Sequence, residues 1–591
     1  MNETIKSIVI SCLKAEGVPA EAILDGSFAV EHPADLSKGD YSTNASLVFA
    51  KTLGRNPVEF ANALVERIKL EPSSDIAKVE TAGPGFINFT LSPLFFNKKV
   101  KEVVEKGKGF GKNEKQKNQV WAVEYASPNP NKAMHLGHMR NTITGVSLCN
   151  LLEAEGATVV REMVDNNRGI AIAKLMWGYL VGAKKDGARV EDISYWQTHK
   201  DEWRGDISVD FSVDDMYIKG SVECEDPEQE KNVRDLVVKW EAKDAMVWDL
   251  WKTVLDFSYE GQRHTLERLG AHFDYVWHEH EHYEEGKRYV EEGLQKGIFK
   301  QLEDGAILTD LEAFGLSDTI VQKSDGTSLY ITQDLALTDL KKKKHKAHHQ
   351  VWVIGPEQSL ALQQLFAVCE QLGIGKREEF THVSYGYVTI KGQGKMSSRA
   401  GNVIFADDLL DLIKEKTEEI MKDRLKDHLE GEDKSVIAEK IALGAAIYEM
   451  LKAGRTKDIA FDLEAALSLD GDSGPYLQYA HTRALSVLRK AKDAGITPDI
   501  ESELVLGDSE LVRKLYRYPE IIHEAATLFA PQQVVTYLTE LASAFNNFYA
   551  HNQIVTESDS SSGKRVALVA AFAIVMQNGL EVLGIKVPER M

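Results

Sequence analysis

The stretch from residue 119 to residue 164 constrains the fold more than any other part of this chain. Residues 119–127 (QVWAVEYAS) have the apolar and β-branched character of a strand, residues 135–156 have the spacing of a helix, and residues 157–164 (ATVVREMV) again resemble a strand. Gly156 is well placed to end the helix. A strand, a helix and a second strand in this order predict a parallel, doubly wound sheet.

The rest of the chain predicts a multidomain α/β protein. Its 591 residues exceed what one hydrophobic core usually serves. Residues 1–115 mix helix-period and strand-like segments, which predicts an α+β N-terminal domain. We expect a Rossmann-like parallel-sheet domain over 116–410, interrupted by an insertion at about 181–305. Residues 411–591 show mainly helical periodicity, which predicts a C-terminal all-α helix bundle.

The net charge of −21 is unevenly distributed along the chain. Residues 191–310 hold 30 Asp and Glu against 14 Lys and Arg, a net charge of −16, so the other residues together carry only −5. An overall negative charge limits non-specific binding to RNA but leaves room for local basic surfaces. Charge therefore neither establishes nor excludes a nucleic-acid partner.

Hydropathy and cysteine usage predict a cytoplasmic protein without a membrane span. We find no uninterrupted apolar run of the roughly 18–20 residues that a span needs, and no basic leader with a cleavage site. The four cysteines are scattered and form no C-x-x-C pair. This spacing argues against a disulfide framework and a structural zinc site, and predicts four small buried side chains.

Two histidines, His135 and His138, stand at the start of the helix predicted over 135–156. Free backbone N–H groups and the positive end of the helix dipole make such a start a natural site for a triphosphate. Gly137 leaves room for a base or ribose close to the backbone. Taken alone, an H-x-G-H sequence is equally compatible with a helix start that carries two incidental histidines.

A glycine-rich loop at 392–402 (GQGKMSSRAGN) follows a later strand of the same predicted sheet. Its residues Lys395, Met396 and Ser397 could close over phosphate groups, because a flexible cationic loop can stabilise charge that develops during displacement. On its own, the loop is also compatible with a solvated basic turn.

Together, the H-L-G-H and K-M-S-S-R sequences resemble the two hallmark motifs of class I aminoacyl-tRNA synthetases, here about 260 residues apart. Further segments resemble the arginyl-tRNA synthetases in particular. These are V-E-Y-A-S-P-N before the first motif, G-D-Y-S-T-N at 39–44, G-P-G-F-I-N-F at 83–89, G-P-Y-L-Q-Y-A-H-T-R at 474–483 and the final V-P-E-R-M. The resemblance covers nearly the whole chain.

This resemblance implies an arginine–tRNA ligase. It would activate L-arginine with ATP and Mg²⁺ to arginyl-adenylate plus pyrophosphate, and then transfer arginine to the 3′ end of its cognate tRNA. It implies that ATP contacts His135, Gly137, His138, Lys395, Met396 and Ser397. It further implies a catalytic domain over 116–410, a D-loop-binding domain over 1–115, an anticodon-binding domain over 411–591, a monomer and no structural metal.

Arginine itself demands a particular pocket, because its planar guanidinium carries five donors that suit paired carboxylates. The resemblance assigns this task to Glu124 and Asp334, assisted by Tyr330 and Gln358, and gives the main-chain groups of arginine to Ser127 and Asn129. For the tRNA, Phe86 could stack on a loop base while Asn88 bonds its edge.

The chain departs from the family pattern at two places. Ser398 occupies a position where class I enzymes often have a second loop lysine, and Lys132 could supply the missing cation from the helix start. Residues 165–170 (DNNRGI) replace a G-D-W-G sequence, of which only Gly169 matches, so the adenosine or arginine contacts of this segment stay open and we assign no role to Arg168.

Two other segments are suggestive but favour plainer interpretations. The alternating histidines of 277–282 (WHEHEH) would share one face of a strand, yet no fourth metal ligand is evident. The basic run 341–346 (KKKKHK) predicts a solvated helix end, with the tRNA acceptor stem as the alternative contact.

Two other functions remain open on the sequence. One is a class I synthetase for another amino acid, such as cysteine, glutamate or lysine. The other is a non-catalytic RNA-binding relative, although such a protein need not retain His135, His138 and Lys395.

Overall fold

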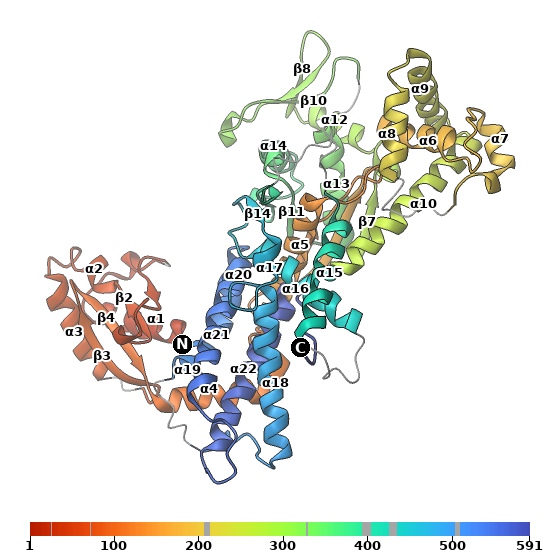
Figure 1. Cartoon of the computed structure of the whole chain (residues 1–591). Helices are drawn as coiled ribbons and strands as arrows, with labels where there is room; N and C mark the ends of the chain where they lie inside the picture. The colour runs from red at the N-terminus through yellow and green to blue at the C-terminus, as the bar shows by residue number, and fades with distance from the viewer. Residues whose placement is uncertain are drawn as a thin grey trace.

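The computed structural model describes residues 1–24, 26–70, 73–205, 213–326, 329–392, 404–424, 434–502 and 509–591. Figure 1 shows an N-terminal α+β part, a central part built on a parallel sheet, and long C-terminal helices beside it. The predicted fold class is therefore confirmed.

The central sheet has five strands in the order β12-β11-β5-β6-β7, and every neighbouring pair is parallel. The strands are β5 (Val120–Glu124), β6 (Thr158–Asp165), β7 (Tyr275–His278), β11 (His349–Val353) and β12 (Phe380–Val383). The chain proceeds from β5 toward β7 on one side and returns to β11 on the other. The strand order therefore reverses beside β5, where open α/β sheets usually bind ligands.

Helix α5 (Leu136–Ala154) follows β5 and is buried along almost its whole length. It contacts the sheet and also α16, α20 and α22 of the C-terminal part. Even Arg140 is only 1% exposed, and its guanidinium donates to the carbonyl oxygens of Gly386 (2.6 Å) and Arg455 (3.1 Å). The other helices beside the sheet are α13 (Tyr330–His345) and α14 (Ser359–Leu372).

The segment expected as an insertion is not continuous, because β7 lies within it and belongs to the central sheet. A helical portion with its own core precedes β7, and a small antiparallel sheet of order β10-β9-β8 follows it. The helices before β7 are α6 (Ile170–Gly182), α7 (Ile193–Thr198), α8 (Val213–Glu223), α9 (Pro227–Glu241) and α10 (Ala245–Arg268). Two more helices, α11 (Glu279–His282) and α12 (Gly286–Gln295), follow β7. The strands are β8 (Phe299–Gln301), β9 (Ile307–Thr309) and β10 (Thr319–Gln322).

The N-terminal part is an antiparallel sheet of order β1-β2-β4-β3 packed with helices. Its strands are β1 (Val30–Glu31), β2 (Tyr41–Thr43), β3 (Ile76–Ala82) and β4 (Phe86–Leu91). Its helices are α1 (Asn2–Ala15), α2 (Ala45–Phe49), α3 (Pro57–Lys69) and α4 (Pro93–Lys106).

The C-terminal part is helical, apart from β14 (Ile459–Phe461), which pairs in parallel with β13 (Val388–Ile390). Its helices are α15 (Ala406–Arg424), α16 (Lys434–Leu451), α17 (Leu463–Ala466), α18 (Gly474–Asp493), α19 (Glu510–Leu515), α20 (Tyr518–Thr527), α21 (Gln532–His551) and α22 (Ser562–Leu583). Helix α22 is long and apolar enough to cross a membrane by length and composition alone, although its apolar run is interrupted. However, 72% of its apolar window is buried in the structure, as in the core helix of a folded domain.

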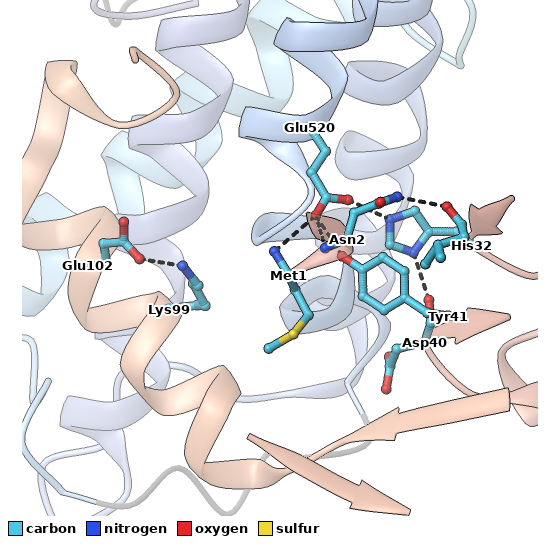
Figure 2. Close-up of polar contacts among 9 residues, drawn as sticks. Met1, Asn2, His32, Asp40, Tyr41, Lys99, Glu102 and Glu520 are labelled. Atoms are coloured by element: carbon cyan, nitrogen blue, oxygen red, sulfur yellow. Dashed lines mark hydrogen bonds and ion pairs between the residues drawn. The ribbon is translucent and has the colours of Figure 1, made fainter. Parts of the chain in front are cut away.

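A polar cluster joins the N-terminal part to α20 (Figure 2). Glu520 accepts hydrogen bonds from the Tyr41 hydroxyl (2.8 Å) and the Asn2 amide (3.1 Å), and lies 3.1 Å from Nε2 of His32. Although burial opposes ionisation, His32, the Met1 amine and Tyr41 lower the pKa of Glu520 to about 2. The carboxylate is therefore a charged junction between segments almost 500 residues apart in sequence.

Candidate functional site

The chain bends sharply where β5 ends at the reversal of strand order. Ala126 and Ser127 have positive φ angles of 65° and 40°, which side chains other than glycine rarely adopt. Asn141 of α5 holds this bend, because its Oδ1 accepts from the Ala126 amide at 2.7 Å. Its Nδ2 donates to the carbonyl of Val353 at 2.8 Å, so the bend is tied to the end of β11.

The two predicted histidines form the cap of α5. Nδ1 of His135 accepts from the Gly137 amide at 3.0 Å, and Nδ1 of His138 accepts from the His135 amide at 3.2 Å. The two rings stack with centroids 3.9 Å apart. A Cβ atom on Gly137 would lie 2.9 Å from Cε1 of His135, so this position requires glycine for the cap itself.

Both imidazoles are held neutral by their surroundings. Burial, and then the charge of Lys132, lowers the pKa of His135. Burial and the two neighbours His135 and Lys132 lower the pKa of His138 to about 3. The charge of Lys132 therefore acts on both histidines. The next residue, Ala133, donates its amide hydrogen to Asp214 of α8 at 2.9 Å.

The loop motif falls largely outside the described residues, which end at Gly392 and resume at 404. Lys395, Met396 and Ser397 therefore have no described position. The returning end of the loop is described: Phe405 forms a β-bridge with His135, and the Ala406 amide donates to the Met134 carbonyl at 2.8 Å. The chain that follows the second motif thus lies directly beside the first motif.

Two predicted arginine ligands, Glu124 and Asp334, are electrostatically coupled. Burial, and then the Glu124 carboxylate, raises the pKa of Asp334 to about 7. Asp334 lies in the first turns of α13, where the surrounding protein raises its pKa although solvent still reaches the side chain. Glu124 ends β5, and its Oε2 is 2.5 Å from the ammonium of Lys341.

The structure brings some of the remaining predicted residues together with Glu124. The Ser127 hydroxyl lies 3.4 Å from Oε1 of Glu124 and accepts from the Val164 amide at 3.0 Å. Oδ1 of Asn129 accepts from Asn166 at 3.2 Å. By contrast, Tyr330 is 84% exposed and Gln358, at the end of a short 3₁₀ turn, is also exposed. Among the described residues, neither side chain bonds to Glu124 or Asp334.

Residues 165–168, which include Arg168 without an assigned role, pack against the histidine-rich segment. Oδ2 of Asp165 is 2.8 Å from Nδ1 of His278, and Asn167 is 3.0 Å from Nδ1 of His280. The guanidinium of Arg168 lies 3.9 Å from the ring centroid of Tyr283.

The alternating pattern of 277–282 was misread, because β7 ends at His278 and α11 begins at Glu279. The three histidines therefore do not share one strand face. Within the described ranges, no group of three or more His, Cys, Asp or Glu could hold a metal ion. The absence of a structural metal stays a prediction.

The basic run of α13 was also misread in part, because Lys341 is 1% exposed rather than solvated. Its neighbours are paired at the surface, Lys342 with Glu379 and Lys343 with Asp339. Lys341 itself reaches Glu124 at the carboxyl end of β5, whereas the helix then leads into the beginning of β11.

For the tRNA, the structure separates the two named candidates. Phe86 at the start of β4 is 39% exposed and can offer its ring. Asn88 is only 6% exposed, and its Oδ1 accepts from the Ser42 hydroxyl at 2.8 Å. The exposed aromatic ring is thus the more accessible of the pair.

The sequence analysis missed a basic and aromatic hollow of about 310 Å³ on the C-terminal helices. Arg483 of α18 stands over the rings of Tyr479 (4.6 Å) and Tyr549 (5.3 Å). Arg489, Lys490 and Arg590 also line it. The available signal was the spacing of Tyr479 and Arg483, four residues apart on one helix face.

Three family models match the chain. They describe the catalytic domain of "tRNA synthetases class I (R)" over residues 99–463, a DALR anticodon binding domain over 477–591 and an arginyl tRNA synthetase N terminal domain over 3–91.

Individual relatives agree with the family models. A Porphyromonas gingivalis arginine–tRNA ligase is 30% identical, covering 99% of this chain and 100% of the relative. A Treponema denticola arginine–tRNA ligase is 32% identical over 97% of this chain and 96% of its own. The solved Thermus thermophilus arginyl-tRNA synthetase has a TM-score of 0.81 at 23% identity and covers both chains fully, which shows a shared fold.

Proposed function

The chain belongs to the arginyl-tRNA synthetase family of class I enzymes, and from this premise we propose which of its residues carry out the reaction. The chain is an arginine–tRNA ligase that charges tRNA with arginine and uses ATP as a substrate. In the first step a carboxylate oxygen of arginine forms a bond to the α-phosphorus of ATP, and the bond to pyrophosphate breaks. In the second step a hydroxyl of the terminal tRNA ribose attacks the carbonyl carbon, and AMP leaves.

We propose that Glu124 and Asp334 bind the guanidinium of arginine. The observation that carries this proposal is their electrostatic coupling at the edge of the sheet, where Glu124 raises the pKa of Asp334. An acid whose ionisation is disfavoured by a neighbouring carboxylate gains most from a ligand that brings a positive charge. Ser127 and Asn129 hold the main-chain groups, and Tyr330 and Gln358 complete the pocket from exposed positions.

The ATP site combines the cap of α5 with the glycine-rich loop. His135, Gly137 and His138 contact the nucleotide as neutral groups, and Lys132, Lys395, Met396 and Ser397 surround the phosphates together with Mg²⁺. The β-bridge between Phe405 and His135 supports this arrangement, because it anchors one end of the loop beside the helix start. Positioning and charge neutralisation are what phosphoryl chemistry chiefly needs.

For the tRNA, we propose that 1–115 binds the D-loop through Phe86, with Asn88 supporting that surface. Residues 116–410 form the catalytic domain and 411–591 bind the anticodon. The hollow around Arg483 suits a splayed base, because aromatic and guanidinium faces stack on bases and the surrounding cations attract phosphate. We propose that the enzyme acts as a cytoplasmic monomer that does not bind a membrane.

The function is tested by ATP–pyrophosphate exchange with arginine against cysteine, glutamate and lysine, each with and without tRNA. Of the four amino acids, we expect only arginine to support exchange. We expect Asp334→Ala to lower kcat/KM for arginine by an amount that corresponds to about 2–4 kcal/mol of transition-state stabilisation. Glu378→Gln, which changes an exposed acid, is the matched control. Unchanged arginine kinetics in Asp334→Ala would exclude the proposed pocket.

A further inference from the structure

A stripe of polar side chains on α13 faces a row of residues that crosses the central sheet. The stripe consists of Asp334, Thr338, Lys341 and His345, which recur every three or four residues. The row consists of Trp352 on β11, Glu124 on β5 and Glu162 on β6, which are paired in register. The helix therefore lays one cation, Lys341, over two carboxylates that lie side by side.

Lys341 is held inside the protein by these two carboxylates. Its ammonium is 2.5 Å from Oε2 of Glu124 and 3.7 Å from Oε2 of Glu162, and it stands 5.8 Å from the ring centroid of Trp352. The two acids overcome the effect of burial, so the pKa of Lys341 is raised rather than lowered. A charged lysine loses its hydration when it is buried, and this free-energy cost is offset only if its partners compensate for it.

The two carboxylates differ in what else they contact. The contacts of Glu162 gather on Oε1, which accepts from the Trp277 indole at 2.9 Å and lies 2.8 Å from Nε2 of His345. Glu124 gives Oε2 to Lys341, whereas Oε1 has the Ser127 hydroxyl at the longer distance of 3.4 Å. Lys341 thus fixes Oε2 of Glu124, whereas Oε1 faces the bend after β5 at which the proposed site begins.

We propose that Lys341 is a positioning residue for arginine recognition: its ammonium binds one oxygen of Glu124, fixes the carboxylate, and leaves the other oxygen to the guanidinium. This inference rests on the proposed arginine pocket. A carboxylate already oriented loses less freedom when the ligand binds, and an internal cation offsets the repulsion between it and a second acid. Lys341 would thus act through Glu124 without touching arginine.

The charged and titratable groups around Lys341 determine how this role responds to pH. They are Glu124 on β5, Glu162 on β6, Asp334 and His345 on α13, and His282 on α11. Glu279 of α11 acts in addition on Asp334. Burial and the carboxylates of Glu124 and Glu279 raise the pKa of Asp334 to about 7, while Lys341 acts to lower it. Removing the lysine charge should therefore raise the pKa of Asp334 further and move arginine binding to higher pH.

The test is Lys341→Met in tRNA charging, with KM for arginine and for ATP measured across pH. We expect the arginine KM to rise at least about 10-fold, because one partner of a buried charge pair is removed. The ATP KM should stay within about twofold, since Lys341 does not approach the histidine cap. The pH midpoint of arginine affinity should move upward, and Lys341→Arg should recover part of the affinity. Lys342→Met, which alters the adjacent surface pair, is the control.

A folding defect is separated from a positioning role by the double variant Lys341→Met/Glu162→Gln. It keeps the net charge of this buried cluster as in the wild type but still lacks the cation on Glu124, so its arginine KM should remain high. A normal arginine KM and pH midpoint in either variant would overturn the proposal. Asp334→Asn is measured in parallel: if it too leaves the arginine KM unchanged, the arginine pocket itself is wrong, whereas an effect of Asp334→Asn alone rejects only the role of Lys341.

Discussion

The side chains His135 and His138 occupy the usual place of cationic phosphate ligands, yet both are neutral. Burial and the nearby Lys132 lower both pKa values, that of His138 to about 3. Neutral imidazoles can donate or accept hydrogen bonds but contribute no net charge at physiological pH. In the proposed mechanism, the positive charge for the leaving pyrophosphate would therefore come from lysine and Mg²⁺.

Replacing the imidazoles should depress the catalytic step more than the stability of the fold. We predict that His135→Asn lowers kcat of tRNA-dependent pyrophosphate exchange by about 10²–10³-fold, the usual effect of losing one stabilising group at a developing phosphate. Asparagine is a good N-cap, so this variant preserves the helix start. Circular dichroism melting checks the fold, and His138→Ala should show the same kinetic loss. Near wild-type kcat in both variants would remove the helix start from the mechanism.

Arginine affinity should depend on the ionisation of Asp334. Because its pKa is raised to about 7, the carboxyl is largely protonated below that pH and cannot pair with the guanidinium. We predict that the arginine KM falls as pH rises through about 7, by up to about tenfold per pH unit on the acid side. Asp334→Asn should raise the KM and abolish this dependence, while the ATP KM serves as the internal control. A pH-independent arginine KM in the wild type would contradict the assignment.

The roles of residues that depend on local sequence context could be predicted, whereas the roles that depend on distant partners could not. The histidine pair could be proposed from its position before a helix. The roles of Asn141 and Lys341 could not, because their partners Val353 and Glu124 lie 212 and 217 residues away. In sequence, Lys341 is simply the first of several lysines at a helix end.

At the scale of elements, β5, α5 and β6 follow the periodicity closely, and the errors occur where a pattern is short. The run at 277–282 alternates as a strand would, but the chain turns after His278 because β7 reaches the edge of the sheet there. Helix α5 shows one apolar face in sequence yet is buried almost all round. Its buried residues Arg140 and Asn141 are accommodated by long-range hydrogen bonds, which periodicity does not reveal.

Two elements meet at the triphosphate in the proposed mechanism: the turn before α5 and the glycine-rich loop. Lys132 acts electrostatically on both histidines, and the loop returns at Phe405 beside His135. Lys132 and Lys395 could therefore flank the same phosphates, with Ser398 where a second loop lysine is often found. At an effective dielectric constant near 20, one cation within about 4 Å contributes several kcal/mol.

If the two lysines share this task, Lys132→Ala should lower kcat strongly, by about 10²-fold. Adding Ser398→Lys to Lys132→Ala should restore part of the loss, because a loop lysine would replace the missing charge. Steady-state pyrophosphate exchange with saturating tRNA measures both effects, and Lys343→Met is a surface control. Normal turnover in Lys132→Ala would reject the idea, as would the absence of any rescue.

At the scale of the whole molecule, the segment 39–44 that resembles the family joins the N-terminal part to the C-terminal helices. Asp40 is 0% exposed, accepts from the Leu91 amide at 2.8 Å and pairs with Arg513 at 3.0 Å. Tyr41 bonds to Glu520 in the cluster of Figure 2. The motif was recognised by resemblance alone, since nothing in the local sequence indicates that its partners lie on α19 and α20.

This junction sets the distance between the two proposed tRNA-binding surfaces, the one around Phe86 and the hollow around Arg483. Removing Arg513 would leave the carboxylate of Asp40 buried without its cation, a change that typically costs about 3–5 kcal/mol. We predict that Arg513→Met lowers the melting temperature and raises the KM for tRNA, while KM values for arginine and ATP change little. Lys514→Met is the matched control, because its partner Glu540 is exposed and such pairs contribute about 0–1 kcal/mol. A tRNA KM unchanged in a destabilised Arg513→Met enzyme would mean that the junction holds the fold without orienting the two surfaces for tRNA.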